Sequence, residues 1–172
     1  MLDNIKEHSV VVAKIVQVIS LGLIKAGIHI SLEKAVAGAL LHDIAKTASL
    51  KVGGDHAAAG KEICLKHQLD EVADIVGEHV WLKDYSPDGE SSEKELVYYA
   101  DKRVLHTSVV RLDERLHDIL ERYGRNNDVL RRCIEANFRV CRAVENELFS
   151  KLHFGPADLA DQIDKTELRS LR

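Results

Sequence analysis

The sequence is poor in cysteine, proline and aromatic residues. Among its 172 residues there are three cysteines and two prolines, and aromatic residues make up 5%. Three cysteines do not provide a disulfide framework. Cys133 and Cys141 fall on one expected helix, where a rise of about 1.5 Å per residue separates them by roughly 12 Å, too far for a disulfide. We therefore expect reduced cysteines and a cytoplasmic protein.

Long apolar runs and an excess of basic charge are also missing. No segment approaches the ~20 consecutive apolar residues of a membrane-spanning helix, and the N-terminus lacks the apolar core of a signal peptide. The formal net charge is −4, so no basic excess indicates nucleic acid or an anionic membrane surface as a partner. We expect neither a membrane nor an obligatory nucleic-acid partner, and the sequence leaves a homodimer open.

The sequence does contain a helical period of hydrophobic residues. Hydrophobic residues make up 45% of the chain and recur about every 3.6 residues, whereas no alternating strand pattern stands out. The pattern predicts helices over 2–26, 31–46, 55–67 and 112–123, and further helices that open at Asp70, at Ser92 (carrying Val97, Val104 and Leu105) and at Asn127. It predicts an all-α fold, a single-domain helical bundle over 1–155 with a short polar tail over 156–172.

Polar residues that cap helices mark several of these starts. Ser31, Asp55 and Asn127 each precede an apolar stripe and can accept a hydrogen bond from the first turn. Ser92 and Glu95 have the spacing of a capping box.

Five polar side chains interrupt apolar stripes. They are His8, His42, Asp43, His79 and Asp101. Helical residues three or four apart share a face, so each of these side chains should point inward. A buried carboxylate is costly unless it is paired or binds a metal. Imidazole nitrogen together with carboxylate oxygen suits iron, manganese, nickel, cobalt or zinc, so the set favours a divalent metal site.

A single histidine or a single His-Asp pair would be weak evidence, because an inward histidine is more often a hydrogen-bonded core residue than a ligand. His117-Asp118 is a second such pair. It does not interrupt the apolar stripe of its helix, so we interpret it as part of a solvated face. His42-Asp43 follows Ala-Leu-Leu and precedes Ile-Ala, inside a helix end that should be buried.

The order and contexts of these residues resemble the HD superfamily of metal-dependent phosphohydrolases. Residues 40–46, LLHDIAK, are similar to its L-L-H-D-I-G-K segment, and residues 100–102, ADK, to its closing A-D-K. The resemblance spans about residues 5–106. No G-Y-P follows His79, so a cyclic-di-GMP phosphodiesterase is not predicted. EHVW at 78–81 replaces the H-T-T-G of the symmetrical dinucleoside tetraphosphate hydrolases.

The resemblance implies an HD-type helical fold that binds one or two divalent transition-metal ions. His8, His42, Asp43 and Asp101 would hold one ion. Two further histidines, His56 and His79, would hold a second, with Asp43 bridging the two. The implied reaction is hydrolysis of a phosphomonoester or phosphodiester, of a nucleotide, by attack of a metal-bound hydroxide.

Several cations near these residues are candidates for binding the substrate. Lys46 lies one turn after Asp43 and, with it, is expected to act in catalysis by holding a phosphate oxygen. Lys102 and Arg103 follow Asp101, and Lys83 follows His79, so each could line the same mouth.

Trp81 could stack on a base, although a packing role is favoured. Two other functions stay open at this point: a di-iron oxygenase on the same scaffold, and a non-catalytic sensor that binds metal and nucleotide. Retained activity with redox-inert metals would exclude the first, and product formation would exclude the second.

Overall fold

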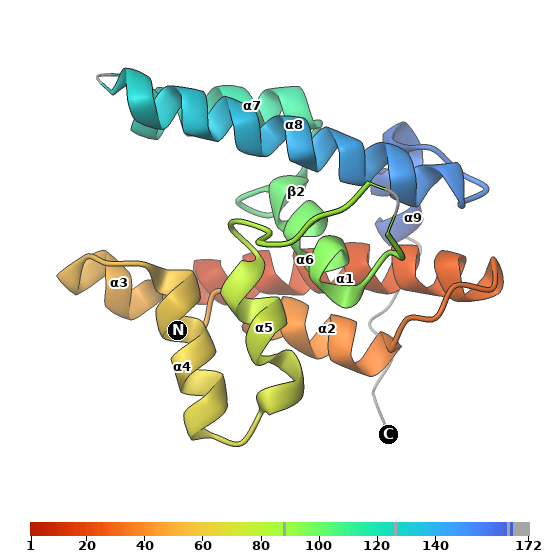
Figure 1. Ribbon diagram of the computed structural model, residues 1–172, viewed down its shortest axis with the longest axis horizontal. Coiled ribbons are helices and arrows are strands. Elements are labelled where there is room, and N and C mark those ends of the chain that lie inside the picture. The colour runs from red at the N-terminus through yellow and green to blue at the C-terminus, as the bar shows by residue number, and fades with distance from the viewer. Residues whose placement is uncertain (88, 126, 165, 167–172) are drawn as a thin grey trace.

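The 3.6-residue apolar period is realised as helices in the computed structural model, which describes residues 1–87, 89–125, 127–164 and 166 (Figure 1). The α-helices are α1 (Asp3–Lys25), α2 (Leu32–Leu41), α3 (Lys46–Val52), α4 (His56–Lys66), α5 (Asp70–Glu78), α6 (Glu93–Lys102), α7 (Leu112–Ile119), α8 (Asp128–Ser150) and α9 (Leu159–Asp164). A π-helical turn, η1 (Leu120–Gly124), continues α7, and a 3₁₀ turn, η2 (Pro156–Asp158), precedes α9. The predicted all-α class is confirmed.

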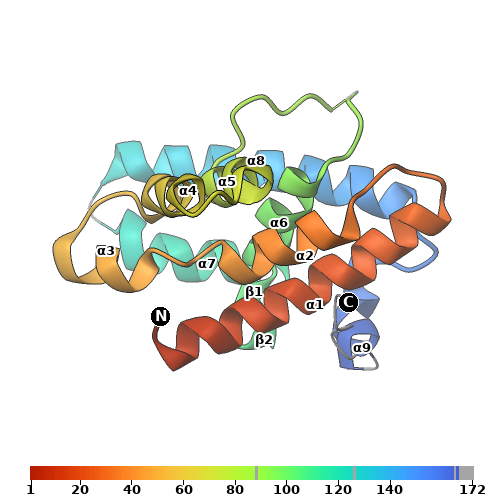
Figure 2. The same cartoon turned by 90° about the horizontal axis from the view of Figure 1, so that it is seen from below.

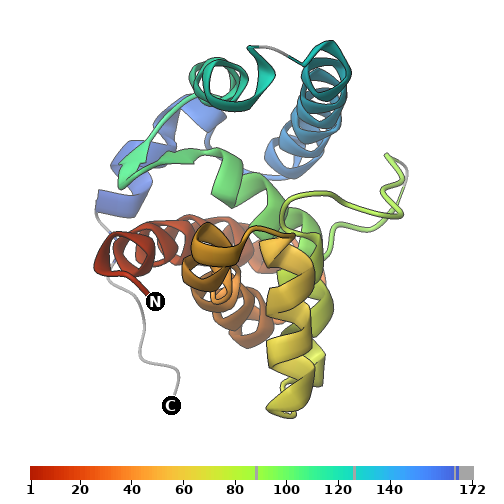
Figure 3. The same cartoon turned by 90° about the vertical axis from the view of Figure 1, so that its left-hand side faces the viewer.

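Helix α6 is the centre of the bundle. It contacts α1, α2, α5 and α8, and it lies between a layer formed by α7 and α8 and a layer formed by α1, α2, α4 and α5 (Figure 3). Five successive residues, Leu96 to Ala100, have no exposed surface. A helix that is buried on all sides has to be surrounded by apolar faces, and the apolar stripes of α1 and α8 supply two of them.

The cap residues behave as the sequence predicts. Ser31 accepts a hydrogen bond from the backbone N–H of Lys34, Asp55 accepts from Ala57 and Ala58, and Asn127 accepts from Leu130. The carboxylate of Glu95 accepts from the backbone N–H of Ser92 at 2.7 Å. Each of these helix starts therefore has one or two backbone donors that a side chain satisfies.

Two helices end earlier than the sequence predicts. The helix expected over 31–46 stops at Leu41, and residues 42–45 form turns in which the N–H of Ile44 bonds to Leu41 and that of Lys46 to Asp43. Likewise, α6 ends at Lys102.

Val104 and Leu105, expected on that helix, instead form strand β1 (Val104–Leu105), which pairs antiparallel with β2 (Ser108–Val109). His106, in the connecting turn, adopts φ +57°. The 3.6-residue period of apolar residues shows which face of a segment is buried. It does not show where the helix ends, because a short turn after the helix keeps the same face inward.

The C-terminal segment differs from the polar tail expected over 156–172. Leu159 and Ile163 are buried in the core, and α9 packs against α1. Residues 156–164 therefore belong to the bundle, while residues 165 and 167–172 lie outside the described part of the chain.

Helix α1 is, among the described residues, the one helix long and apolar enough to cross a membrane by length and composition. Of its most apolar 18-residue window, 56% is buried inside the fold. Val12, Ile15 and Ile19 are fully buried, and α1 lies alongside α2 (Figure 2). That burial is typical of the core helix of a folded domain.

We predict that Gly38→Ala destabilises the protein, although alanine is the better helix former. A Cβ at Gly38 would lie 2.5 Å from Cγ2 of Ile75, so α2 and α5 would have to separate. We expect the free energy of unfolding to fall by about 1–3 kcal/mol, measured by urea denaturation.

The control is a double-mutant cycle with Ile75→Ala, which removes the clashing atoms. The cost of Gly38→Ala should shrink in that background. An equal cost in both backgrounds would contradict this packing explanation.

Candidate metal centre

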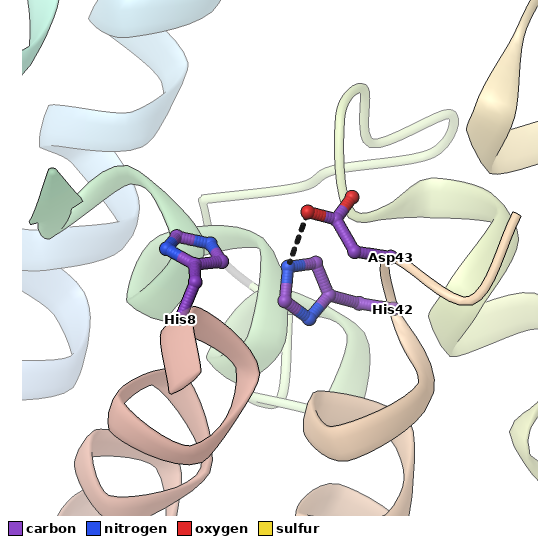
Figure 4. Close-up of side chains that lie close together, drawn as sticks. All are labelled: His8, His42 and Asp43. Carbon is purple, nitrogen blue, oxygen red and sulfur yellow. Dashed lines mark ion pairs between the residues drawn. The ribbon is translucent and has the colours of Figure 1, made fainter. Parts of the chain in front are cut away.

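Six ionisable side chains from five parts of the chain converge at one place between the helices. His8 comes from α1, and His42 and Asp43 from the turn after α2. His56 is the first residue of α4, His79 directly follows α5, and Asp101 lies in the last turn of α6. Figure 4 shows His8, His42 and Asp43 facing one another. The structure brings together every residue that the sequence predicts as a metal ligand.

The imidazole rings are fixed by backbone carbonyl groups. Nδ1 of His42 lies 2.7 Å from the carbonyl oxygen of Ala39, and Nδ1 of His79 lies 2.6 Å from that of Val76. Nδ1 of His8 lies 2.9 Å from the carbonyl oxygen of His106. A carbonyl can only accept, so each Nδ1 carries the proton. In the neutral ring, Nε2 is then left with a lone pair directed at the carboxylates.

Asp43 lies between two groups of donors. Its Oδ2 is 3.5 Å from Nε2 of His42, and its Oδ1 is 3.3 Å from Nε2 of His56 and 3.6 Å from Nε2 of His79. We call the first group, His8, His42, Asp43 and Asp101, the inner half-site. The second, Asp43, His56 and His79, is the outer half-site, because the His56 side chain is 25% exposed and that of His42 is not exposed at all.

Asp101 completes the inner half-site. Its Oδ1 lies 3.1 Å from Nε2 of His8 and 3.6 Å from Nε2 of His42. In the outer half-site, the two Nε2 atoms of His56 and His79 are 3.1 Å apart. Ligand atoms at about 2.0–2.2 Å from one transition-metal ion are roughly 3.0–3.5 Å from each other. The separations in both half-sites fall close to this range.

Two atoms at the centre are buried without a hydrogen-bond partner among the described residues. They are Nε2 of His42 and Oδ1 of Asp43. Unpaired buried acceptors are costly, and a lone pair facing a carboxylate is repelled unless a proton or a cation lies between them. The donor set therefore fits a divalent cation, which both acceptors can bind at once.

The two carboxyl groups are ionised. Burial would raise the pKa of Asp43, but the imidazoles of His56 and His79 and the charges of His42 and Lys46 lower that pKa well below its usual range. Burial would likewise raise the pKa of Asp101, and His42 and His8 lower it. Burial lowers the pKa of His79, which keeps this imidazole neutral. Burial would lower the pKa of His42, but Asp101 and Asp43 raise that pKa above its usual value. Because a metal ligand has to be a neutral imidazole, a bound ion would take the place of the proton between His42 and the carboxylates.

The HD domain model matches residues 5–104, more than half of the chain. The chain belongs to the HD domain family. This family is one of metal-dependent phosphohydrolases whose members bind divalent metal ions, and the His/Asp clusters described above could hold such an ion.

Relatives of this HD protein are known from archaea and bacteria. An uncharacterized protein of Methanocaldococcus jannaschii is 27% identical over 150 residues, which are 78% of this chain and 86% of that protein. Ribonuclease Y of Fervidobacterium nodosum and of Thermosipho melanesiensis are each 36% identical over 78 residues, which are 45% of this chain and 14% of each ribonuclease. No solved structure matches.

A cavity of about 450 Å³ opens onto the metal centre of this HD protein. His56 and Asp101 lie in its wall, together with Lys46 and Lys102. Nζ of Lys46 is 2.8 Å from Oδ2 of Asp43, and about a third of the lysine side chain is exposed. Lys46 is therefore placed at the edge between the carboxylate and the open cavity.

The other predicted substrate-binding cations are placed differently. Lys102 borders the cavity, but its ammonium donates to the carbonyl oxygens of His79 and Tyr98, and burial lowers its pKa to about 8. It fixes the backbone beside a candidate ligand.

Arg103 and Lys83 need a correction, because neither lines the cavity. The guanidinium of Arg103 is committed to Glu145 at 3.1 Å and to the carbonyl oxygen of Pro156 at 2.9 Å. Lys83 is exposed, and its backbone N–H donates to Glu78.

Sequence reasoning did not identify Arg115, Arg122 and Asn137, which also line the cavity. They lie beyond the matched motif, and nothing in their spacing distinguishes them from ordinary helix-surface residues.

Trp81, for which a packing role was favoured, lines the cavity and is 45% exposed. In the second His-Asp pair, His117 is exposed, and Asp118 is partly buried and pairs with Arg115 and Arg122.

We predict that protein purified without added metal or chelator contains about two transition-metal ions per chain, and that Asp43→Ala loses them because Asp43 belongs to both half-sites. His117→Ala is the matched control, since it removes the histidine of the other His-Asp pair. Elemental analysis measures the content.

The single variants His8→Ala and His56→Ala should each remove the ion of one half-site. Absence of metal from the wild-type protein, with no uptake of iron, manganese or nickel, would contradict the assignment of both half-sites.

Proposed function

We propose that this protein hydrolyses a phosphate ester of a small molecule, a nucleotide, using one or two divalent metal ions held by His8, His42, Asp43, His56, His79 and Asp101. The substrate is soluble, and neither a membrane nor a nucleic-acid polymer takes part. The observation that carries the proposal is the position of Asp43, which turns one oxygen toward each half-site. Its ion-pair partner Lys46 and two further candidate ligands, His56 and Asp101, line the adjoining cavity.

Divalent ions in these half-sites would act as Lewis acids on phosphate oxygens and lower the pKa of water. The protein's own residues supply the rest. Asp43, ionised and 1% exposed, keeps its charge fixed between the half-sites. Lys46 neutralises part of that charge and can turn its ammonium to a phosphate oxygen in the cavity. His56, the most exposed of the candidate ligands, lies where the substrate would enter.

The size of the cavity favours a small substrate. About 450 Å³ lies toward the lower end of the range for small-molecule pockets and suits a single nucleotide. The two relatives named ribonuclease Y share only a segment with this chain. Their name supports nucleotide phosphate chemistry. It does not extend to an RNA polymer as the substrate of this chain, because a formal net charge of −4 does not favour binding of a polyanion.

We expect release of inorganic phosphate from nucleoside monophosphates, or of a nucleotide from a phosphodiester, that stops on metal chelation and returns with manganese, nickel, cobalt or zinc. Phosphate release is measured colorimetrically, and bis(p-nitrophenyl) phosphate tests the diester. Return of activity with redox-inert zinc would also exclude an oxygenase. A fully metallated protein that binds nucleotides without turnover would contradict the proposal and indicate a sensor module.

We predict that Lys46→Met lowers kcat/KM at least about tenfold, because a charge-assisted hydrogen bond to phosphate contributes about 1.5–3 kcal/mol. Lys51→Met is the matched control, since Lys51 lies exposed on the same helix and does not line the cavity. It should leave kcat/KM unchanged. Equal effects of the two substitutions would show that Lys46 acts only through general charge or stability.

A further inference from the structure

Much of the wall of the cavity is built from a part of the chain that the HD domain match does not cover. The match ends at residue 104, and helices α7, η1 and α8 all follow it. They pack on one another and form the upper layer of the molecule (Figures 1 and 3). Arg115, Arg122 and Tyr123 line the cavity from α7 and η1, and Ile134 and Phe138 from α8.

Arg115 is the most deeply placed cation of this wall. Its side chain is 14% exposed, and Nη1 bonds to Oδ2 of Asp118 at 2.8 Å. Its Nε is buried and has no hydrogen-bond partner among the described residues. A guanidinium has five N–H donors in a planar fork that matches phosphate. Asp118 thus orients the guanidinium of Arg115 from one side, and the remaining N–H groups of that guanidinium are left to donate to a ligand.

The charges around the cavity are unbalanced. Lys46, Lys102, Arg115 and Arg122 line it, whereas Asp101 is the one carboxylate among the described lining residues. Arg115 lies within electrostatic range of both lysines. Asp118 compensates the two arginines, with Oδ1 2.8 Å from Arg122, but it does not line the cavity. Asp43, which does not line the cavity either, lies 2.8 Å from Lys46. The lining itself still presents more cationic than anionic side chains and is suited to an anion.

The remaining surface of the wall is apolar and aromatic. Trp81 and Tyr123 are 45% and 62% exposed, although both line the cavity. Ile134 and Phe138, buried from α8, form its apolar floor. A planar heterocycle fits such a surface, because aromatic side chains stack on bases of any sequence.

We propose that Arg115 binds the phosphate of the substrate, and that the wall formed by Trp81, Tyr123 and α8 binds the base, so that the substrate class is a nucleoside monophosphate. The assignment rests on the proposed function, because it places the phosphate between Arg115 and the metal centre. It adds that residues of α7, η1 and α8, which lie outside the matched segment, bind the substrate together with Trp81 from within that segment.

Binding can be measured without turnover. Trp81 is the only tryptophan of the chain, so its fluorescence reports on the cavity alone. The ligand is the non-hydrolysable phosphonate analogue of adenosine 5′-monophosphate, and adenosine is the comparison that lacks the phosphate. We expect both to change the fluorescence of the wild-type protein in its metal-loaded form, and the phosphonate to bind at least about tenfold more tightly.

Arg115→Met keeps the apolar stem and removes the donors. It should weaken binding of the phosphonate about tenfold or more and change adenosine binding less than about twofold. Arg125→Met is the matched control: Arg125 also pairs with an acidic residue one turn away, Glu121, but it does not line the cavity. If Arg115→Met does not fold, Arg115→Lys keeps the charge without the fork and should show an intermediate affinity.

Unchanged phosphonate binding in Arg115→Met, or an equal loss of phosphonate and adenosine binding, would overturn the role of Arg115. Absence of a fluorescence change with the monophosphates of all four common bases would overturn the substrate class. These outcomes are separate from failure of the proposed function. Phosphate release from non-nucleotide esters without nucleotide binding would leave the hydrolase intact, and nucleotide binding without phosphate release would leave this inference intact.

Discussion

The structure depends on how one buried carboxylate is compensated. Asp43 is 1% exposed and ionised, and the ammonium of Lys46 2.8 Å away is the nearest fixed positive charge. The imidazoles around it offer lone pairs because their protons are held by backbone carbonyls. Isolated charges of this kind are strongly disfavoured inside a protein. A cation bound between Asp43 and the imidazoles would turn this unfavourable arrangement into a coordination site.

The ends of the helices explain how the donors are oriented. His42 and His79 are the C-cap residues of α2 and α5, and each donates from Nδ1 to the carbonyl oxygen three residues earlier. The last carbonyls of a helix have no intrahelical donor, so the imidazole satisfies one of them and is fixed in return. The same local geometry thus occurs twice and presents two Nε2 atoms to one carboxylate, 3.5 and 3.6 Å from its oxygens.

Periodicity was sufficient to predict the all-α fold and to bring five of the donors to one interior, because polar residues on apolar stripes have few other places to lie. The sixth, His56, begins a helix and interrupts no stripe, so only the family resemblance indicated it. Periodicity extended the helix of His42 to Lys46 and not to Leu41, since a tightened turn keeps the same face inward. It missed the carbonyl of His106, because that contact depends on a two-stranded turn with positive φ. Arg103 was misplaced because adjacency to Asp101 does not fix direction: successive helical residues point about 100° apart, and Arg103 pairs with Glu145.

The six candidate metal ligands and the cavity-lining residues of α7, η1 and α8 come from different parts of the chain. The segment over 5–104 carries all six candidate ligands and is the part that matches the family. The wall that faces them, α7 to α8, has no motif, and its cations are held by Asp118 and not by the metal centre. Under the proposed assignment, the metal ligands and much of the substrate-binding wall belong to different segments, which pack on each other through α6 and α8 and also face each other across the cavity.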